Sequence, residues 1–293
     1  MQPKTIADGR DTSADTPAFP DHWGIATAEL FTETVSSRIW QVRVGDGRLA
    51  VVKDLKPIKD VQDGLNGADY LAWRDGIGAI RLLGRDGHRL LLEHAGGRPL
   101  SQEIAAQGDS VATGIAAEVM ARLLAPPVDG WPAHLPPLRQ RFAGLFAKAR
   151  ADDHAEVKSL YGEAARLADG LLAEPHDVRP LHGDLHHDNI ISGPRGWLVL
   201  DPIGIVGDPG FDAANMFYNP LDRNDLCRDP ARIAAMAESF SRVLGQSPRR
   251  LLDHAVAYGC LSASWHAEDD NRPDEERELA VALAIRAVRD RGF

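Results

Sequence analysis

The sequence predicts an α+β fold with a small β-rich N-terminal lobe and a larger helical C-terminal lobe. Residues 35–55 alternate apolar and polar side chains on both sides of an Asp-Gly turn, which is the pattern of a β-hairpin. After Gly97 the apolar residues recur three and four positions apart, which indicates helices. A chain of 293 residues, 44% of them hydrophobic, is long enough to bury a core in each lobe.

The elements follow this division in order. Residues 1–18 are rich in Asp, Thr, Ala and Pro, so we expect a poorly ordered tail. The N-terminal lobe is assigned to residues 19–95, with the hairpin, a helix over residues 61–72 and two short strands, RLLG and HRLLLEHA. The C-terminal lobe takes residues 96–293. Its helices are interrupted between His182 and Asp212 by an irregular stretch rich in Gly, Pro, Asp and His, the kind of loop that carries chemistry.

Composition excludes several classes of function. The formal net charge is −10, from 43 acidic and 33 basic residues. This excess argues against nucleic acid or an anionic membrane as a partner and favours a cationic ligand, although it is equally consistent with solubility alone. Cys227 and Cys260 form no C-x-x-C pair, so we expect neither a disulfide framework nor a zinc site. The absence of a signal peptide or an apolar span predicts a cytoplasmic protein.

The segment LHGDLHHDNIISGPRGWLVLD contains the main catalytic signal. Asp184, Asn189 and Asp201 lie in it, five and twelve positions apart. Phosphoryl transfer needs one carboxylate that orients the acceptor hydroxyl, and an amide and a second carboxylate that hold Mg²⁺ on the phosphates of ATP. The order matches the protein-kinase loop H-x-D-x-x-x-x-N, which precedes a strand ending in Asp. We therefore predict a kinase with Asp184 as its catalytic carboxylate.

This segment also resembles the aminoglycoside phosphotransferase family, whose signature H-G-D-x-x-x-x-N is present from His182 to Asn189. The stretch DPIGIVGDPGFDAANMF is similar to the streptomycin 6-phosphotransferase and hydroxyurea kinase branch, as are FPDHW, KPIKD, GADYLAWRDGIGAIRLLG and AYGCLSASW. The resemblance covers about residue 19 to the C-terminus. It implies a two-lobed protein-kinase-like fold, Asp184 as the base, and Asn189 and Asp201 as magnesium ligands. The implied acceptor is streptomycin at its 6-hydroxyl, with hydroxyurea as the alternative.

The nucleotide-binding residues are predicted less completely. Lys53 lies on the strand LAVVKDL, where the kinase pattern V-A-I-K places the lysine that pairs with the α- and β-phosphates; an outward lysine on an amphipathic strand is the alternative. No G-x-G-x-x-G loop precedes it. Ser36 and Ser37 are the candidate phosphate donors, unless they only form a polar turn. By resemblance, a hinge from Glu93 to Ala95 contacts adenine through its backbone.

The helix after Lys53 offers Asp63 and Asp69 but no glutamate, so the carboxylate partner of the lysine stays open. Asp212 is expected to be structural and to accept backbone N–H bonds from the catalytic loop. Asp208 is the better candidate for binding a substrate amine. His182 is expected to pack rather than to bind metal.

A second acidic cluster follows near the C-terminus. Trp265 precedes Glu268, Asp269 and Asp270, and carboxylates beside an aromatic ring suit a guanidinium group. The alternative is a solvated acidic loop. The resemblance favours a loop that binds the substrate.

Two rival hypotheses remain. The first is a two-metal phosphoesterase, which would use His182, Asp184, His186, His187 and Asp188 but would need further ligand clusters, such as a G-N-H segment, that the chain lacks. The second is a kinase-like module that binds without catalysis, which would be favoured if one of the three oxygen-bearing residues were missing. The segment GDGRLA is a hairpin turn rather than a dinucleotide motif, and no Walker A sequence occurs.

Overall fold

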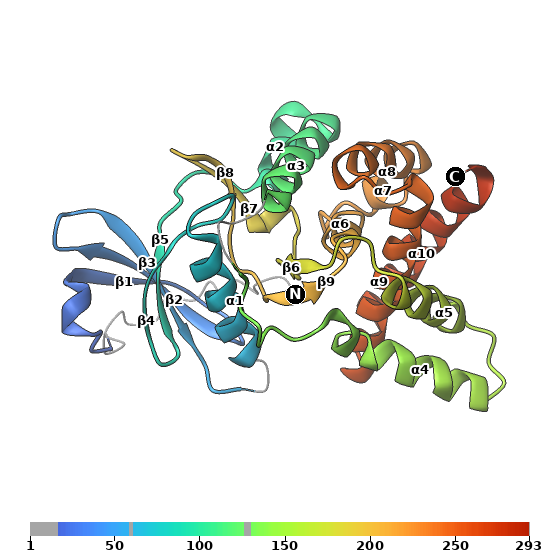
Figure 1. Ribbon diagram of the computed structural model, residues 1–293, viewed down its shortest axis with the longest axis horizontal. Helices are drawn as coiled ribbons and strands as arrows, with labels where there is room; N and C mark the ends of the chain where they lie inside the picture. The colour runs from blue at the N-terminus through green and yellow to red at the C-terminus, as the bar shows by residue number, and fades with distance from the viewer. Residues whose placement is uncertain (1–16, 59–60, 126–129, 293) are drawn as a thin grey trace.

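The computed structural model describes residues 17–58, 61–125 and 130–292, and the chain forms two lobes in it (Figure 1). The N-terminal lobe is built on an antiparallel sheet, and the C-terminal lobe is mainly helical. The predicted α+β, two-lobed fold is confirmed. Of the expected tail, only Pro17 and Ala18 lie within the described residues.

The N-terminal sheet has the strand order β1-β2-β3-β5-β4. The strands are β1 (Ile25–Glu33), β2 (Ser37–Val44), β3 (Leu49–Leu55), β4 (Leu82–Asp86) and β5 (Arg89–Glu93). The predicted hairpin is β2–β3, in which Trp40 lies opposite Val52. Both residues are buried in a small core with Trp23 and Leu91. Strand β1 was not predicted, because this edge strand exposes most of its side chains, Phe31 to 73%.

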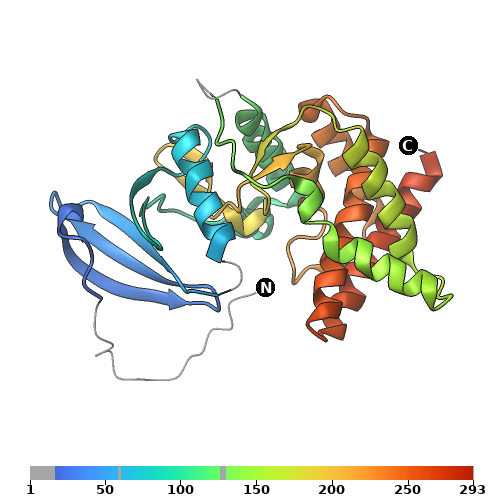
Figure 2. The same ribbon diagram turned by 60° about the horizontal axis from the view of Figure 1, so that its bottom comes forward.

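Helix α1 (Val61–Arg74) packs beside the sheet and faces the C-terminal lobe (Figures 1 and 2). The contact between the lobes is close at Gly67, where an added Cβ would lie 1.8 Å from the carbonyl oxygen of Pro202. Only glycine allows this approach. The helix backbone therefore rests directly on the segment that follows Asp201.

The C-terminal lobe is a helical assembly with its core around the longest buried helix, α9. Its α-helices are α2 (Leu100–Gln107), α3 (Asp109–Leu124), α4 (Ala143–His154), α5 (Leu160–Ala173), α6 (Gly210–Met216), α7 (Asn224–Cys227), α8 (Pro230–Leu244), α9 (Pro248–Glu268) and α10 (Arg272–Gly292). Figure 2 shows α4, α5, α9 and α10 packed at the end far from the sheet. Within the described ranges, no helix is both long and apolar enough to cross a bilayer.

Two short ribbons lie between the helices. Strand β6 (Arg179–Leu181) pairs with β9 (Ile205–Gly207), and β7 (Ile190–Gly193) pairs with β8 (Gly196–Val199). The β6–β9 pair closes a loop of chain whose two ends therefore lie side by side. Those ends are residues 182–189, which include the short 3₁₀ helix His187–Asn189, and residues 200–204.

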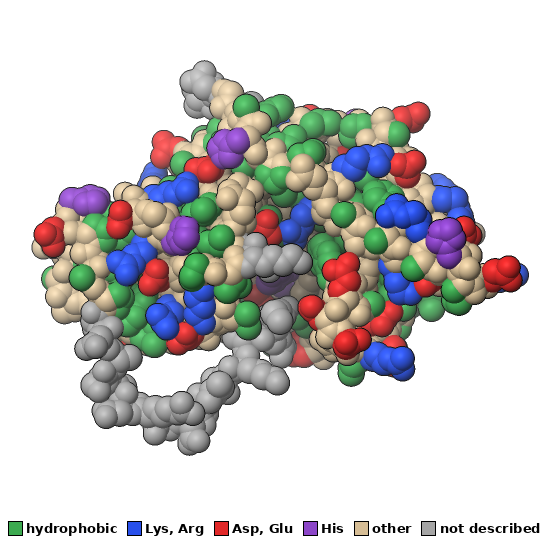
Figure 3. Space-filling view, turned by 90° about the horizontal axis from the view of Figure 1, so that it is seen from below, with side chains coloured by type: hydrophobic (Ala, Val, Ile, Leu, Met, Phe, Trp, Pro, Cys, Tyr) green, Lys and Arg blue, Asp and Glu red, His purple; other side chains and the backbone are tan. Residues whose placement is uncertain are grey.

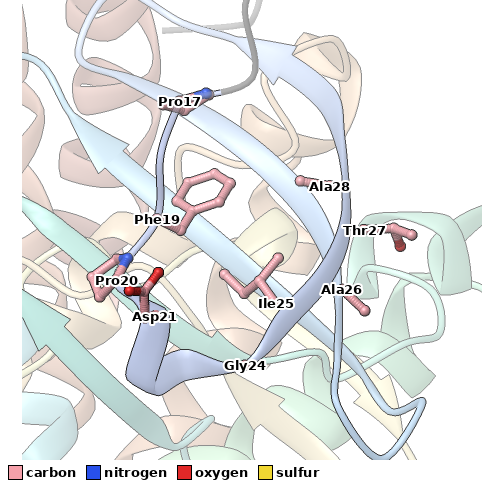
Figure 4. A pocket seen from close by; sticks show the side chains of 9 residues that line it. All are labelled: Pro17, Phe19, Pro20, Asp21, Gly24, Ile25, Ala26, Thr27 and Ala28. Carbon is pink, nitrogen blue, oxygen red and sulfur yellow. The ribbon is translucent and has the colours of Figure 1, made fainter.

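A pocket lies at the start of β1, apart from these ribbons (Figure 4). The 3₁₀ helix Asp21–Trp23 leads into it, and Phe19 and Ile25 supply apolar side chains. No residue of the predicted site lines it.

Candidate active site

Backbone hydrogen bonds join the two ends of the loop closed by β6 and β9. The N–H of Ile203 donates to the carbonyl of His182 at 2.8 Å, and the N–H of Leu200 donates to the carbonyl of Asn189 at 3.0 Å. These bonds bring Asp184 and Asn189 beside Asp201. The predicted catalytic residues are therefore assembled by the pairing of short strands rather than by one rigid sheet.

His182 connects the same two segments through its ring. Its Nε2 donates to the carbonyl of Leu200 at 2.9 Å, and its Nδ1 accepts the N–H of Asp184 at 3.2 Å. Complete burial lowers the pKa of His182 to about 4, so the ring is neutral near pH 7. The position of this side chain is that of a packing residue.

Asp212, on α6, anchors the start of the catalytic loop at His182 and Gly183. Its carboxylate accepts the N–H groups of His182 at 2.9 Å and Gly183 at 2.7 Å. Burial raises the pKa of Asp212 to about 7, although the two backbone N–H bonds act in the opposite direction. Gly183 has φ +83°, a conformation that favours glycine. Together these features fix the direction in which the loop leaves β6.

Asp184 lies at the surface of this assembly, with 42% of its side chain exposed. Its Oδ1 accepts a hydrogen bond from Nδ2 of Asn215 at 3.0 Å. Its Oδ2 is 3.8 Å from Nε2 of His186, which is too long for a hydrogen bond. One carboxylate oxygen is therefore held, and the other is accessible. The surface is hollowed between the lobes, with acidic side chains along its C-terminal-lobe side (Figure 3).

Asn189 and Asp201 offer the oxygen ligands expected for magnesium. Nδ2 of Asn189 donates to the carbonyl of Asp184 at 2.9 Å, so the amide oxygen is the end left for a cation. Asp201 has φ +58°, an uncommon conformation for a residue with a side chain. Partial burial opposes its ionisation, yet the ammonium of Lys53 holds the pKa of Asp201 below its usual value. A carboxylate and an amide oxygen fit Mg²⁺.

The partner of Lys53, which the sequence left open, is Asp201 itself. The two acidic residues of α1 are engaged elsewhere. Asp63 pairs with Arg141 at 2.7 Å, and Asp69 pairs with Arg85 at 3.0 Å. The lysine of β3 thus reaches across the lobe boundary to the predicted metal ligand.

The turn between β1 and β2 holds the two predicted phosphate donors. Ser37 is 2% exposed, and its N–H donates to Oγ1 of Thr34 at 3.0 Å, so its donor groups are used within the turn. Ser37 therefore does not fit the predicted role of a phosphate donor. The sequence alone did not show that Thr34 closes the turn. Ser36 is exposed, and the prediction of a phosphate contact now rests on it.

The predicted hinge connects β5 to the helical lobe. The Glu93 carboxylate pairs with Arg195 at 2.5 Å, which ties the end of β5 to the β7–β8 turn. Ala95 is buried, and its carbonyl would lie 2.2 Å from a Cβ added at Gly193. The hinge is therefore held closely against the β7–β8 ribbon. Contact of its backbone with adenine stays a prediction.

Asp208 does not occupy the substrate position that we predicted for it. It is 2% exposed, and its carboxylate accepts hydrogen bonds from Nη2 of Arg250 at 2.8 Å, Nε2 of Gln246 at 2.6 Å and the N–H of His176 at 2.7 Å. Burial opposes ionisation, but the His254 and Arg250 side chains hold the pKa of Asp208 well below its usual range. Asp208 is a structural anion. Its partners come from distant parts of the chain.

The predicted substrate loop lies where α9 ends. Glu268 is the last residue of α9, and Asp269 and Asp270 follow it as exposed residues before α10. The ring of Trp265, however, already makes a cation–π contact with the guanidinium group of Arg141, whose Cζ lies 5.0 Å from the ring centroid. One face of the ring that we assigned to a substrate cation is thus occupied by Arg141.

The geometry does not support the rival hypothesis of a two-metal phosphoesterase. Across residues 17–58, 61–125 and 130–292, no three His, Cys, Asp or Glu side chains converge as a cation site. The short run of His and Asp that motivated it instead divides into buried His182 and His187, half-buried Asp184 and His186, and exposed Asp188.

Comparison with known proteins identifies the family of the chain. The family described as aminoglycoside/hydroxyurea antibiotic resistance kinase matches residues 22–270. The chain is 38% identical over 266 residues to a streptomycin 3″-kinase of Klebsiella pneumoniae, covering 89% of this chain and 94% of that one. It is 31% identical to a hydroxyurea phosphotransferase of Kitasatospora aureofaciens, covering 91% and 76% of the two chains. With a streptomycin 6-kinase of Streptomyces glaucescens the identity is 28%, over 91% and 86%.

Solved structures show the same fold. A thermostable mutant of the aminoglycoside phosphotransferase APH(4)-Ia, in ternary complex with AMP-PNP and hygromycin B, superposes with a TM-score of 0.62 at 18% identity, covering 92% of this chain and 95% of that one. A choline/ethanolamine kinase family protein from Mesorhizobium loti has a TM-score of 0.63 at 14% identity, covering 93% and 96%. The chain is therefore a phosphotransferase and belongs to the aminoglycoside/hydroxyurea antibiotic resistance kinases, within the aminoglycoside phosphotransferase family.

Proposed function

We propose that this chain transfers the γ-phosphoryl group of ATP to a hydroxyl of streptomycin and so inactivates the antibiotic. The observation that supports it most is the meeting of Asp184, Asn189 and Asp201 with Lys53 at the lobe boundary. This is the set of groups that phosphoryl transfer requires. The family to which the chain belongs supplies the class of acceptor.

Each residue has a distinct task in the proposed reaction. The ammonium of Lys53 aligns the phosphates of ATP. The oxygens of Asn189 and Asp201 would hold magnesium, which would neutralise the charge of these phosphates. Oδ2 of Asp184 accepts the hydrogen bond of the acceptor hydroxyl and takes its proton as that oxygen attacks phosphorus and the bond to ADP breaks. The protein contributes positioning and charge stabilisation more than covalent chemistry.

Charge supports streptomycin as the acceptor. The net charge of −10 and the exposed acids Glu268, Asp269 and Asp270 suit a molecule with two guanidinium groups. Their contact with the substrate stays a prediction. Buried Asp208 is no longer part of it. Hydroxyurea is small and neutral and needs none of these charges, so it is the second candidate, supported by the 31% identity to a hydroxyurea phosphotransferase.

Two hydroxyls of streptomycin compete as the site of transfer. The resemblance to the streptomycin 6-phosphotransferase branch implies the 6-hydroxyl, whereas the 38% identity to a 3″-kinase, against 28% to a 6-kinase, favours the 3″-hydroxyl. Two-dimensional ³¹P–¹H NMR of the product separates them, because the phosphorus couples to the ring proton of the modified carbon.

A panel of acceptors tests the proposal. ADP release is followed in a coupled assay with streptomycin, dihydrostreptomycin, kanamycin and hydroxyurea at equal concentrations. We expect stimulation by the first two compounds. Stimulation by hydroxyurea alone would identify hydroxyurea as the acceptor. Stimulation by kanamycin alone would contradict the streptomycin assignment.

A further inference from the structure

The catalytic carboxylate is held by a residue that no motif singled out. Asn215 lies on α6, is 5% exposed, and donates its Nδ2–H to Oδ1 of Asp184 at 3.0 Å. An amide can present either its nitrogen or its oxygen at such a place. Only the nitrogen bonds to a carboxylate, so the orientation of this amide decides whether Asp184 is held or repelled.

That orientation is set by a second buried amide, Asn219. Its Nδ2 donates both to the backbone carbonyl and to Oδ1 of Asn215, each at 3.1 Å. An amide nitrogen has no acceptor to offer, so Oδ1 of Asn215 must face Asn219, and Nδ2 of Asn215 must face Asp184. The direction of the hydrogen bonds is therefore unambiguous along the chain of three residues.

Asn219 is itself fixed from the opposite side. Its backbone carbonyl accepts Nη2 of Arg232 at 2.9 Å, and Nε of Arg232 pairs with Asp109 at 2.8 Å. Arg232 and Asn219 are almost fully buried. The series from Asp109 to Asp184 thus links α3, α8 and α6 to the catalytic loop through buried polar contacts, in which Nη1 of Arg232 alone lacks a partner among the described residues.

We propose that Asn215 and Asn219 are positioning residues for the transfer reaction. By occupying Oδ1 of Asp184 they stop the carboxylate from turning and direct Oδ2 toward the acceptor hydroxyl. This inference rests on the proposed role of Asp184. A displacement of about 1 Å at such a group costs roughly 10²-fold in rate, so the two amides act on turnover rather than on binding.

The experiment separates positioning from mere support of the fold. Asn215→Leu removes the donor to Asp184, and Asn219→Leu removes only the group that orients Asn215. Active sites are counted by titration with a fluorescent ATP analogue, and kcat is expressed per site. We expect kcat per site to fall about 10- to 100-fold for Asn215→Leu and less for Asn219→Leu. The KM values for ATP and streptomycin should stay within about threefold of wild type.

A purely structural role gives another result. Misfolding would lower the number of sites and the melting temperature, but the remaining sites would turn over at the wild-type rate, and this outcome would overturn the inference. Asn224→Leu, at an exposed asparagine of α7, is the matched control and should leave kcat unchanged. Asp184→Ala is measured in parallel. If it retains full turnover, the proposed function fails; if it is inactive while both leucine variants are normal, only the positioning inference fails.

Discussion

The catalytic loop and the β1–β2 turn are built in opposite ways. In the loop, His182 and Asn189 are buried. His182 bonds to Leu200 and to Asp212 of α6, and Asn189 bonds to the carbonyl of Asp184. The turn is exposed, with Val35 at 67%, and closes mainly on itself through Thr34. Under the proposed function, the loop with Asp184 and Asn189 is preorganised, whereas the turn with Ser36 is completed by the nucleotide.

The largest effect is expected from removal of the carboxylate that we propose to be catalytic. Asp184→Ala should lower kcat by roughly 10²-fold or more, because general-base and positioning contributions are of that size. The Kd for ATP should stay within about threefold, since the carboxylate makes no contact with Lys53. Steady-state kinetics and nucleotide titration measure the two quantities. A loss of ATP affinity equal to the loss of kcat would place Asp184 on the phosphate side instead.

The next largest effect is expected at Lys53. Lys53→Gln removes the charge assigned to the phosphates and should raise the KM for ATP by about 10- to 100-fold, the size of a lost charged hydrogen bond. The KM for streptomycin should not change. Lys148→Gln, on α4, removes the same charge from a partly buried pair with Asp152 in the helical lobe and should leave both constants unaltered. Equal KM values for ATP in the two variants would disprove the phosphate role.

Because histidines of the catalytic loop are buried, the stability of the protein should depend on pH. Neither ring nitrogen of His187 has a hydrogen-bond partner among the described residues, and burial lowers the pKa of His187 to about 3. The unfolded chain therefore binds a proton near pH 6.5 that the folded chain refuses, so stability is lost as pH falls below 6.5. His182 acts in the same direction, and Asp212, whose pKa is raised, opposes both.

The substitution His187→Phe isolates this contribution. From pH 8 to pH 5, wild type should lose about 2 kcal/mol more free energy of unfolding than the variant, according to a titration between pKa 6.5 and 3. Urea unfolding at the two pH values gives the difference. Parallel losses in both proteins would show that His187 takes up its proton in the folded state.

The smallest expected effects distinguish the two serines of the turn. Ser37→Ala should cost about 1 kcal/mol of stability, because its hydroxyl lies 3.2 Å from Oγ1 of Thr34, with no change in the KM for ATP. Ser36→Ala should leave stability unchanged and raise the KM for ATP a few-fold. Thermal unfolding and ATP kinetics on both variants decide this, and a reversed pattern would exchange their assignments.

The sequence predicts those site residues that lie close together in one motif. Asp184, Asn189 and Asp201 lie in one motif, and the type of each side chain indicates its chemistry. The hairpin was predictable because β2 and β3 each pack one face on a core. Strand β1 was missed, since an edge strand with most side chains exposed lacks that alternation.

The rest depends on contacts between distant residues. Asp208 was predicted as a substrate ligand because it lies nearer than Asp212 to the strand that ends in Asp201. Gln246, Arg250 and His254 instead close around it from the helical lobe. The face of Trp265 is covered by Arg141 in the same way. Asn215 had one weak signal, a polar residue within the apolar run FDAANMF, and only its bond to Asp184 gave that signal a meaning.

The central claim is tested most directly by following the γ-phosphoryl group itself. Wild-type protein is incubated with magnesium, streptomycin and ATP labelled in the γ-phosphate, and the label is located after separation of the products. The account predicts that the label appears in streptomycin monophosphate, in equal amount to the ADP formed, with little ADP formed when streptomycin is omitted. Label found only in inorganic phosphate, at a rate independent of streptomycin, would contradict it.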